Sequence, residues 1–203
     1  MAQVQLRGGP GGPPPKVVAR VQRDRLFRAL AQVSAERGYA ATTVAHVLSR
    51  AKISRRTFYT LFDDKEECLL AAYGEAMDDA FDTVVGVCRN GEDPAARIRR
   101  GARVIAELCR DEPAIAGLCV VEILGAGPAG QAARMESTDR FISVLEPLLR
   151  ELGYDDGSIS LHTRALVGIL NETIYDRLSR QDVAGLPDLV DEMIGAQVRQ
   201  ATG

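Results

Sequence analysis

The chain has 203 residues, which is long enough for one small domain and a larger one with a sizeable apolar core. Its mildly acidic net charge of −3 does not by itself point to nucleic acid. No run of about 18 uncharged apolar residues occurs, so we expect no membrane span. The Gly- and Pro-rich N-terminus lacks the apolar stretch of a signal peptide, which predicts a cytoplasmic protein.

Charge is distributed unevenly along the chain. Residues 1–65 contain 12 Lys and Arg against 4 Asp and Glu, a balance of +8, whereas the remaining residues contain 13 against 24, a balance of −11. Such asymmetry is typical of a basic module that faces DNA, joined to an acidic body. Two solvated surfaces of unequal charge are the alternative.

The chain opens with MAQVQLRGGPGGPPP, in which Gly and Pro dominate and nothing is periodic. We expect residues 1–15 to form a disordered arm, because this composition cannot build a packed core. The arm either touches phosphates with the help of Arg7 and Lys16 or has no role.

Residues 17–37 carry the first clear helical pattern. Leu26, Leu30 and Val33 recur on one face, and arginines crowd the other. Gly38 is a suitable residue to end this helix. Thr42 or Thr43 is then expected to cap the next helix, which leaves the hydroxyl of the other threonine available to a phosphate.

The stretch from Thr42 to Lys65 contains two short amphipathic segments around a break at Ala51-Lys52. Ser54 stands where an N-cap belongs, and the second segment follows it. Its inward face consists of Phe58, Leu61 and Phe62. Its outward face consists of Arg55, Arg56, Tyr59 and Thr60. A short helix that buries apolar side chains and presents guanidiniums and hydroxyls suits the DNA major groove, so we predict a helix-turn-helix.

The run from Gly38 to Leu70 resembles the N-terminal domain of TetR/AcrR-family transcriptional regulators. The matching elements are Gly38-Tyr39, Thr42-Thr43-Val44, Ala51, Ile53-Ser54, Thr57-Phe58-Tyr59, Phe62, Lys65-Glu66 and Leu69-Leu70. The resemblance implies a three-helix DNA-binding domain over residues 16–65. It also implies a divergent, all-helical domain over residues 66–203 that binds an effector and dimerises.

Two residues depart from the family pattern. Lys52 stands where the family usually has glycine, so the backbone there must either avoid a positive φ or accept strain. Leu61 stands where the family usually has His or Tyr, which removes one polar contact near the DNA backbone.

The resemblance also assigns roles to single residues. Tyr59, Lys65, Thr43 and Thr57 match residues that contact backbone phosphates; a half-buried tyrosine and a solvated lysine are the alternatives for the first two. The Lys65 ammonium would act beside a helix N-terminus, which also favours phosphate. Lys65→Ala is therefore expected to weaken binding to all DNA sequences alike.

Arg55 and Arg56 occupy the variable part of the recognition helix. At least one should bind a guanine O6 and N7, unless both contact only phosphates. Thr60 is a candidate for a thymine methyl, whereas His46 is expected at the surface or in packing. The predicted DNA-binding set is Thr43, Ser54, Arg55, Arg56, Thr57, Tyr59, Thr60 and Lys65.

The remaining chain shows helical periods and no competing strand pattern. A capping box at Asp63 and Glu66 is expected to start a fourth helix that reaches about Cys88. The later helices are expected at Ala95–Cys109, from Asp111-Glu112-Pro113 through Leu124, from near Ala129 towards Leu152, at Ser158–Arg180 and at Pro187–Ala201. The architecture is therefore predicted to be all-α, with about nine helices.

One short recognition helix reads too few base pairs to find a site in a genome, so we expect a homodimer on a palindromic operator. The last two helices, which are rich in apolar residues, supply an isologous surface. The resemblance implies a cavity for a small effector, which we expect to be hydrophobic or amphipathic and to release the operator. Its candidate lining residues are Met77, Phe81, Cys88, Cys109, Cys119, Glu122, Phe141 and His162. Glu122 or His162 would orient the effector.

Other classes of function receive little support. The sequence contains no GxSxG, no paired metal-ligand motif and no strand-linked glycine fingerprint, so we expect no catalytic residue, metal or cofactor. The cluster Gly125–Pro128 follows no strand, which argues against a phosphate loop. A helical scaffold without DNA binding and a redox switch through the cysteines, which would need exposed low-pKa thiols, remain as alternatives.

Overall fold

The computed structural model describes residues 14–89 and 93–200, and this part of the chain is built from α-helices and one short 3₁₀ helix. In chain order these are α1 (Pro15–Arg37), α2 (Val44–Ala51), α3 (Arg55–Leu61), α4 (Lys65–Cys88), α5 (Pro94–Asp111), α6 (Pro113–Val120), the 3₁₀ helix η1 (Glu122–Ala126), α7 (Gly127–Glu151), α8 (Ile159–Ser179) and α9 (Leu186–Gln200). No strand occurs among the described residues, so the predicted all-α class is confirmed.

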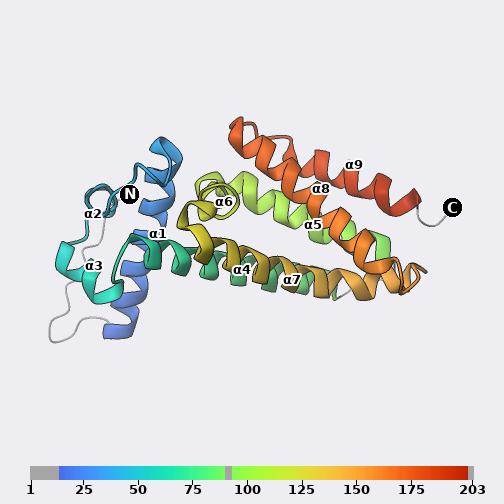
Figure 1. The fold of residues 1–203 in the computed structure, drawn as a ribbon, viewed down its shortest axis with the longest axis horizontal. Helices are drawn as coiled ribbons and strands as arrows, with labels where there is room; N and C mark the ends of the chain where they lie inside the picture. The colour runs from blue at the N-terminus through green and yellow to red at the C-terminus, as the bar shows by residue number, and fades with distance from the viewer. Residues whose placement is uncertain (1–13, 90–92, 201–203) are drawn as a thin grey trace.

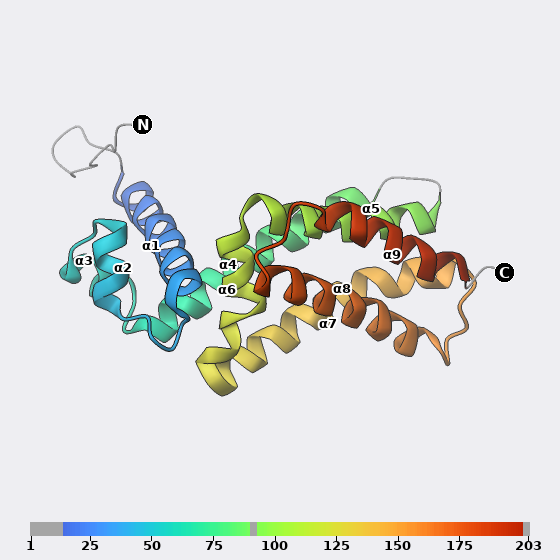
Figure 2. The same ribbon diagram turned by 90° about the horizontal axis from the view of Figure 1, so that it is seen from above.

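The helices form a small unit at one end and a longer bundle beside it. Figure 1 shows α1, α2 and α3 together on the left and the later helices on the right, and Figure 2 shows the same division from above. The 24 residues of α4 span about 36 Å and run from the small unit into the bundle. This helix therefore joins the small unit to the rest of the chain.

Two clusters of buried side chains hold the molecule together. The first packs α1, α2 and α3 against the start of α4, and it also contains Leu118, Cys119, Ile123 and Ala126 from α6 and η1. The second lies among α4, α5, α6, α7, α8 and α9. The first core thus extends beyond the boundary that we predicted between residues 65 and 66, and this boundary stays a prediction.

The segment between α6 and α7 differs from its prediction. We expected helix from Asp111 through Leu124 and a new helix near Ala129, but α6 ends at Val120 and a 3₁₀ turn follows. The turn ends at Gly127, whose φ of 60° suits glycine, and α7 begins there. A Cβ at Gly130 would lie 2.0 Å from the carbonyl oxygen of Ile123, so only glycine lets α7 pack this closely on η1.

The predicted arm comprises residues 1–15. Its first 13 residues lie outside the described part of the chain, and Pro15 already opens α1.

Within the described ranges no single helix has the length and the apolarity that a membrane span requires. One pair of helices, Pro113–Val120 and Glu122–Glu151, meets these criteria only when both are taken together, and the pair is bent by 45°.

Candidate DNA-binding surface and ligand cavity

A tight turn fixes the angle between α2 and α3. Lys52 adopts a left-handed conformation with φ 56° and ψ 43°. Of the two predicted possibilities, avoidance of a positive φ or acceptance of strain, the structure shows the second. Arg25 of α1 donates to the carbonyl oxygen of Ala51 at 2.5 Å, which ties the end of α2 to α1. Ser54 then caps α3 as predicted, because its Oγ accepts a hydrogen bond from the N–H of Thr57 at 3.1 Å.

Replacing Lys52 with glycine is expected to stabilise the protein. A left-handed residue with a Cβ costs about 1–2 kcal/mol, while glycine loses about 0.5–1 kcal/mol in chain entropy, so the net gain is up to about 1.5 kcal/mol. Denaturant unfolding of Lys52→Gly measures it. Lys52→Ala is the control, because alanine removes the charge and keeps the Cβ; equal stability of the two variants would contradict the expectation.

Apolar side chains anchor α3 from within. Phe58 is 1% exposed, and its ring lies 5.8 Å from that of Phe62, which in turn lies 5.8 Å from Phe27 of α1. Leu61 is half-buried against the same core. Because three aromatic rings fix one side of this short helix, its opposite side is presented to solvent in a defined orientation.

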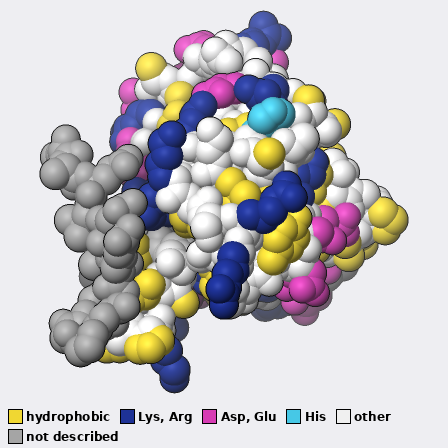
Figure 3. Space-filling view, turned by 90° about the vertical axis from the view of Figure 1, so that its left-hand side faces the viewer, with side chains coloured by type: hydrophobic (Ala, Val, Ile, Leu, Met, Phe, Trp, Pro, Cys, Tyr) yellow, Lys and Arg dark blue, Asp and Glu magenta, His cyan; other side chains and the backbone are white. Residues whose placement is uncertain are grey.

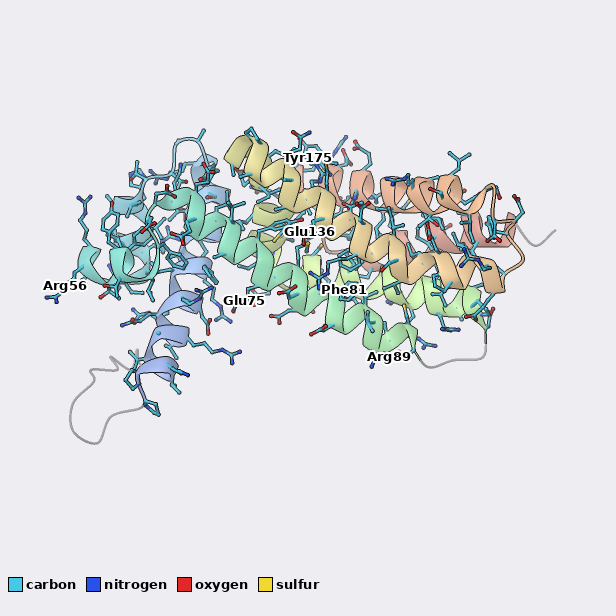
Figure 4. All side chains as sticks on the ribbon, turned by 60° about the horizontal axis from the view of Figure 1, so that its bottom comes forward. Arg56, Glu75, Phe81, Arg89, Glu136 and Tyr175 are labelled. Atoms are coloured by element: carbon cyan, nitrogen blue, oxygen red, sulfur yellow. The ribbon has the colours of Figure 1, made fainter. Side chains whose placement is uncertain are left out.

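The opposite side of α3 carries the polar residues predicted to meet DNA. Arg55, Arg56, Tyr59 and Thr60 are exposed, and the ring of Tyr59 rests edge-on against Phe58, with the ring centroids 5.3 Å apart. Among the described residues, neither arginine has a carboxylate within 4.0 Å. Figure 4 shows Arg56 projecting from α3 at the end of the molecule, and Figure 3 shows Lys and Arg side chains spread over this end.

The two threonines before α2 have different roles. Thr43 caps α2 by accepting from the N–H of His46, and the His46 ring accepts from the N–H of Thr43 in return, at 3.3 Å each. Thr42 is buried and its hydroxyl donates to the carbonyl of Gly38 at 2.8 Å. The expectation that the hydroxyl of the non-capping threonine stays available to a phosphate is therefore wrong, because the Thr42 hydroxyl donates its hydrogen to the Gly38 carbonyl at the end of α1.

Lys65 is half-buried, and backbone carbonyls hold its ammonium. Its Nζ donates to the carbonyls of Tyr39 and Thr42, both at 2.8 Å, and lies 3.8 Å from the centroid of the Tyr39 ring. Burial lowers the pKa of its ammonium. An ammonium has three donors, so one remains for the predicted phosphate contact.

The start of α4 is shifted by one residue from its prediction. Asp64, not Asp63, is the N-cap, and its carboxylate accepts from the N–H of Glu67 at 2.8 Å. Glu67 in turn accepts from the N–H of Asp63. The predicted capping box of Asp63 and Glu66 is therefore not formed: Asp64 caps the helix, and Glu67 accepts from the N–H of the residue before the N-cap.

A cavity of about 490 Å³ runs through the larger bundle and reaches α1 of the small unit. Five of the predicted lining residues lie on its wall: Met77, Cys88, Cys109, Cys119 and Phe141. Most of the remaining wall is aliphatic and includes Val84, Ile98, Ile105, Leu145, Leu166, Leu170, Ile174 and Ile194. Such a lining accommodates an apolar chain or ring system.

Three predicted lining residues do not line the cavity, because other contacts hold them. Phe81 packs against Phe141 with ring centroids 5.6 Å apart, and Figure 4 shows it on α4. The carboxylate of Glu122 accepts from the N–H of Tyr39 at 2.7 Å, towards the small unit. His162 is exposed and stacks edge-on against Tyr154. Neither Glu122 nor His162 is therefore placed to orient an effector in this cavity.

The polar part of the cavity wall was missed from the sequence; besides residues of α7, it includes Arg20, Asp24, Arg28, Glu75, Asp79 and Glu112. Arg134, Ser137 and Thr138 project from α7 into the lining, beside Phe141. No carboxylate of the described residues lies within 4.0 Å of the Arg134 guanidinium. The spacing of i, i+3, i+4 and i+7 places these residues on one face of α7, but only the packing of α7 shows that this face lines the cavity.

The cysteines are buried thiols. Burial raises the pKa of Cys68 and of Cys109 to about 12. It also raises that of Cys119 to about 12, with a smaller rise from the neighbouring Cys109. Because only a thiolate is a good nucleophile, this environment disfavours the redox switch that the sequence left open.

Alkylation of these thiols is expected to be slow in the folded protein. At pH 8 a pKa of about 12 leaves only about one thiolate in ten thousand, against about one in ten at the unperturbed value of 9.0. Iodoacetamide should therefore modify Cys68, Cys109 and Cys119 on the order of a thousandfold more slowly than in urea, as followed by mass spectrometry. Rapid modification of the folded protein at pH 8 would restore the redox hypothesis.

Comparisons with known proteins agree with this geometry. The profile of the family described as "Bacterial regulatory proteins, tetR family" matches residues 26–72, which include α2, α3 and part of α1 and α4. The chain is 30% identical over 141 residues to the uncharacterised HTH-type transcriptional regulator Rv0767c of Mycobacterium tuberculosis, a match that covers 66% of this chain and 62% of that protein. It is also 30% identical over 73 residues to the uncharacterised HTH-type regulator YuxN of Bacillus subtilis, over 36% of this chain and 25% of that one.

Solved structures share the whole fold at low sequence identity. The fatty acid degradation regulator FadR of Bacillus halodurans superposes with a TM-score of 0.76 at 20% identity, over 86% of this chain and 94% of that one. The transcriptional regulator FadR of Bacillus subtilis, solved in complex with stearoyl-CoA, gives a TM-score of 0.75 at 18% identity, over 86% and 98% of the two chains. The helix-turn-helix geometry, the profile match over residues 26–72 and the regulator relatives, of whose length the chain spans less than two thirds, together support a TetR-family transcriptional regulator.

Proposed function

We propose that this protein is a homodimeric repressor that binds a palindromic operator and leaves it when a small, hydrophobic ligand occupies the cavity. The observation that carries the proposal is the exposed side of α3. Two guanidiniums without a carboxylate partner among the described residues stand on a helix that a cap, a tight turn and an aromatic core hold rigidly. This arrangement supports direct readout of a major groove, and we propose that the protein acts in the cytoplasm, with the DNA.

The proposed contacts divide into two groups. Arg55 and Arg56 are assigned to base edges, with Thr60 beside them, because they lie on the exposed side of α3. Phosphate contacts are assigned to Thr43, Ser54, Thr57 and Lys65, which lie at the starts of α2, α3 and α4, and to Tyr59 of α3. The hydroxyls of Ser54 and Thr57 lie 2.9 Å apart, so one phosphate oxygen can accept from this pair.

Dimerisation through α8 and α9 is supported by the surface of α8. Leu161, Ala165, Gly168 and Tyr175 are all exposed and follow one another at intervals of four, three and seven residues. This spacing puts an apolar and small-residue stripe on one face of the helix. Leu161 is 71% exposed, which is unusual for a large apolar side chain and is explained if a second copy covers it.

The cavity favours an effector with a long apolar part and an anionic group. Its aliphatic wall suits the first, and the Arg134 guanidinium, beside Ser137 and Thr138, suits the second. The Bacillus subtilis neighbour of this fold was solved with stearoyl-CoA, which has both features. We therefore propose an acyl thioester or a related amphipathic anion as the first class of compound to test.

Release then follows from a population shift. The cavity wall includes α4, which carries the recognition unit, so a ligand that prefers one tilt of α4 favours one separation of the paired α3 helices. If this separation does not match the spacing of the half-sites, ligand and operator compete through the protein conformation.

The decisive test combines a footprint with a ligand titration. We expect salt-dependent protection of a palindrome upstream of the gene that encodes this protein, and loss of protection when acyl-CoA of increasing chain length is added. Free coenzyme A is the matched control, because it keeps the anionic head without the chain. Absence of DNA binding at low salt would overturn the proposal and favour a helical scaffold.

A further inference from the structure

The peptide that links α1 to α2 is clamped from two sides. The N–H of Tyr39 donates to the Glu122 carboxylate of η1 at 2.7 Å. The carbonyl of the same residue accepts from Lys65 of α4 at 2.8 Å, and Lys65 also holds the carbonyl of Thr42. One residue of the small unit is thus fixed at the same time by the first residue of α4 and by η1.

The ring of Tyr39 is also in close contact with α4 and η1. It is buried, with the Lys65 ammonium 3.8 Å from its centroid. On the side of η1, a Cβ at Gly125 would lie 2.7 Å from Cδ1 of the ring, closer than real contacts allow. Gly125 therefore lets η1 approach the ring directly, so a displacement of η1 changes its contact with the Tyr39 ring.

The clamp is continuous with the wall of the cavity. Ile115, Ala116, Cys119 and Val120 of α6 line the cavity, and η1 begins two residues after Val120. The other contacts between α6 and the small unit are apolar, as in the burial of Leu118 in the first core. Apolar contacts tolerate sliding, whereas a hydrogen bond from an N–H to a carboxylate weakens steeply when its distance or angle changes.

We infer that Glu122 is a positioning residue that couples the occupancy of the cavity to the placement of α2 and α3. A ligand that displaces α6 moves η1, and η1 moves or releases the Tyr39 peptide, which lies four residues before the α2 N-cap Thr43. This inference rests on the proposed function and adds to it a route from the ligand to the recognition helix that runs through η1. Figure 1 shows α6 beside α1, where this route crosses between the two parts of the molecule.

The test uses a cavity-filling substitution in place of a ligand. Ala116→Phe on α6 occupies part of the cavity, and the readout is hydrogen exchange of the Tyr39 amide and of residues 39–62. We expect Ala116→Phe to accelerate exchange of this segment about tenfold or more, because it displaces the acceptor. In a Glu122→Ala background, exchange should already be fast, and Ala116→Phe should change it less than about twofold.

Two further variants separate coupling from a general loss of structure. Glu122→Gln keeps an oxygen that can accept from Tyr39, so it should retain the response to Ala116→Phe. Glu136→Ala removes an exposed carboxylate from α7, labelled in Figure 4, and should behave as the parent. Ala116→Leu replaces Ala116→Phe if circular dichroism shows that the larger residue disturbs the fold.

The same variants are then titrated with the operator. Ala116→Phe should change operator affinity about tenfold in the parent and less than about twofold in Glu122→Ala. Equal responses in both backgrounds, or no response of the parent segment to cavity filling, would overturn the inference. Failure to bind any DNA would overturn the proposed function alone, because the exchange experiment needs no operator.

Discussion

Replacing Arg55 with alanine is expected to weaken operator binding by about 1–3 kcal/mol, which is about fivefold to 150-fold in affinity. The guanidinium of Arg55 is exposed on α3 and has no carboxylate partner among the described residues, so its removal leaves the protein fold intact. The loss should be largest on the operator, and specificity should relax at one base pair in each half-site. Fluorescence anisotropy with the operator and with random DNA measures both effects.

The control is Arg89→Ala, which removes the same side chain from the far end of α4. Figure 4 shows Arg89 at the opposite end of this helix from the small unit that carries Arg56. It should leave affinity and specificity unchanged. Equal losses on operator and random DNA for Arg55→Ala, together with a smaller salt dependence, would assign Arg55 to a phosphate instead of a base.

Introducing a charge at Gly168 is expected to dissociate the proposed dimer. Gly168 lies in the exposed stripe of α8, and an added Cβ would meet nothing within 4 Å in the protomer, so Gly168→Glu should fold normally. In a symmetric interface each substitution occurs twice, and two carboxylates would be buried close together. We expect the dimer Kd to rise by about a hundredfold or more, and operator affinity to fall with it.

Sedimentation or mass photometry across micromolar concentrations measures the change. Gly86→Glu is the matched control, because Gly86 is an exposed helical glycine of α4 whose Cβ would also meet nothing within 4 Å. A parent protein that is monomeric at micromolar concentration would contradict the prediction, and so would a Gly168→Glu variant that stays dimeric. Leu161→Arg, at the other end of the stripe, provides an independent second disruption.

Local patterns predicted most of the helices and the turn chemistry. Thr43 and Ser54 cap α2 and α3 as expected, and Phe58 and Phe62 point into the core while Arg55 stays outside. These features depend on residues three or four positions apart, which the sequence displays directly. The boundary between α6 and α7 was predicted less well, because the close packing of Gly130 on Ile123 shapes it.

The amino-acid sequence by itself therefore determined the all-α class, the recognition helix and its outward arginines, since all of these follow from short-range periodicity and capping. The tertiary structure alone decided what Lys65 and Glu122 contact. Lys65 binds a carbonyl 26 positions away, and Glu122 binds an N–H 83 positions away, and no local pattern specifies such partners. The same holds for the cavity, because helices distant in sequence build its wall, and the inward position of Arg134 depends on how α7 packs against its neighbours.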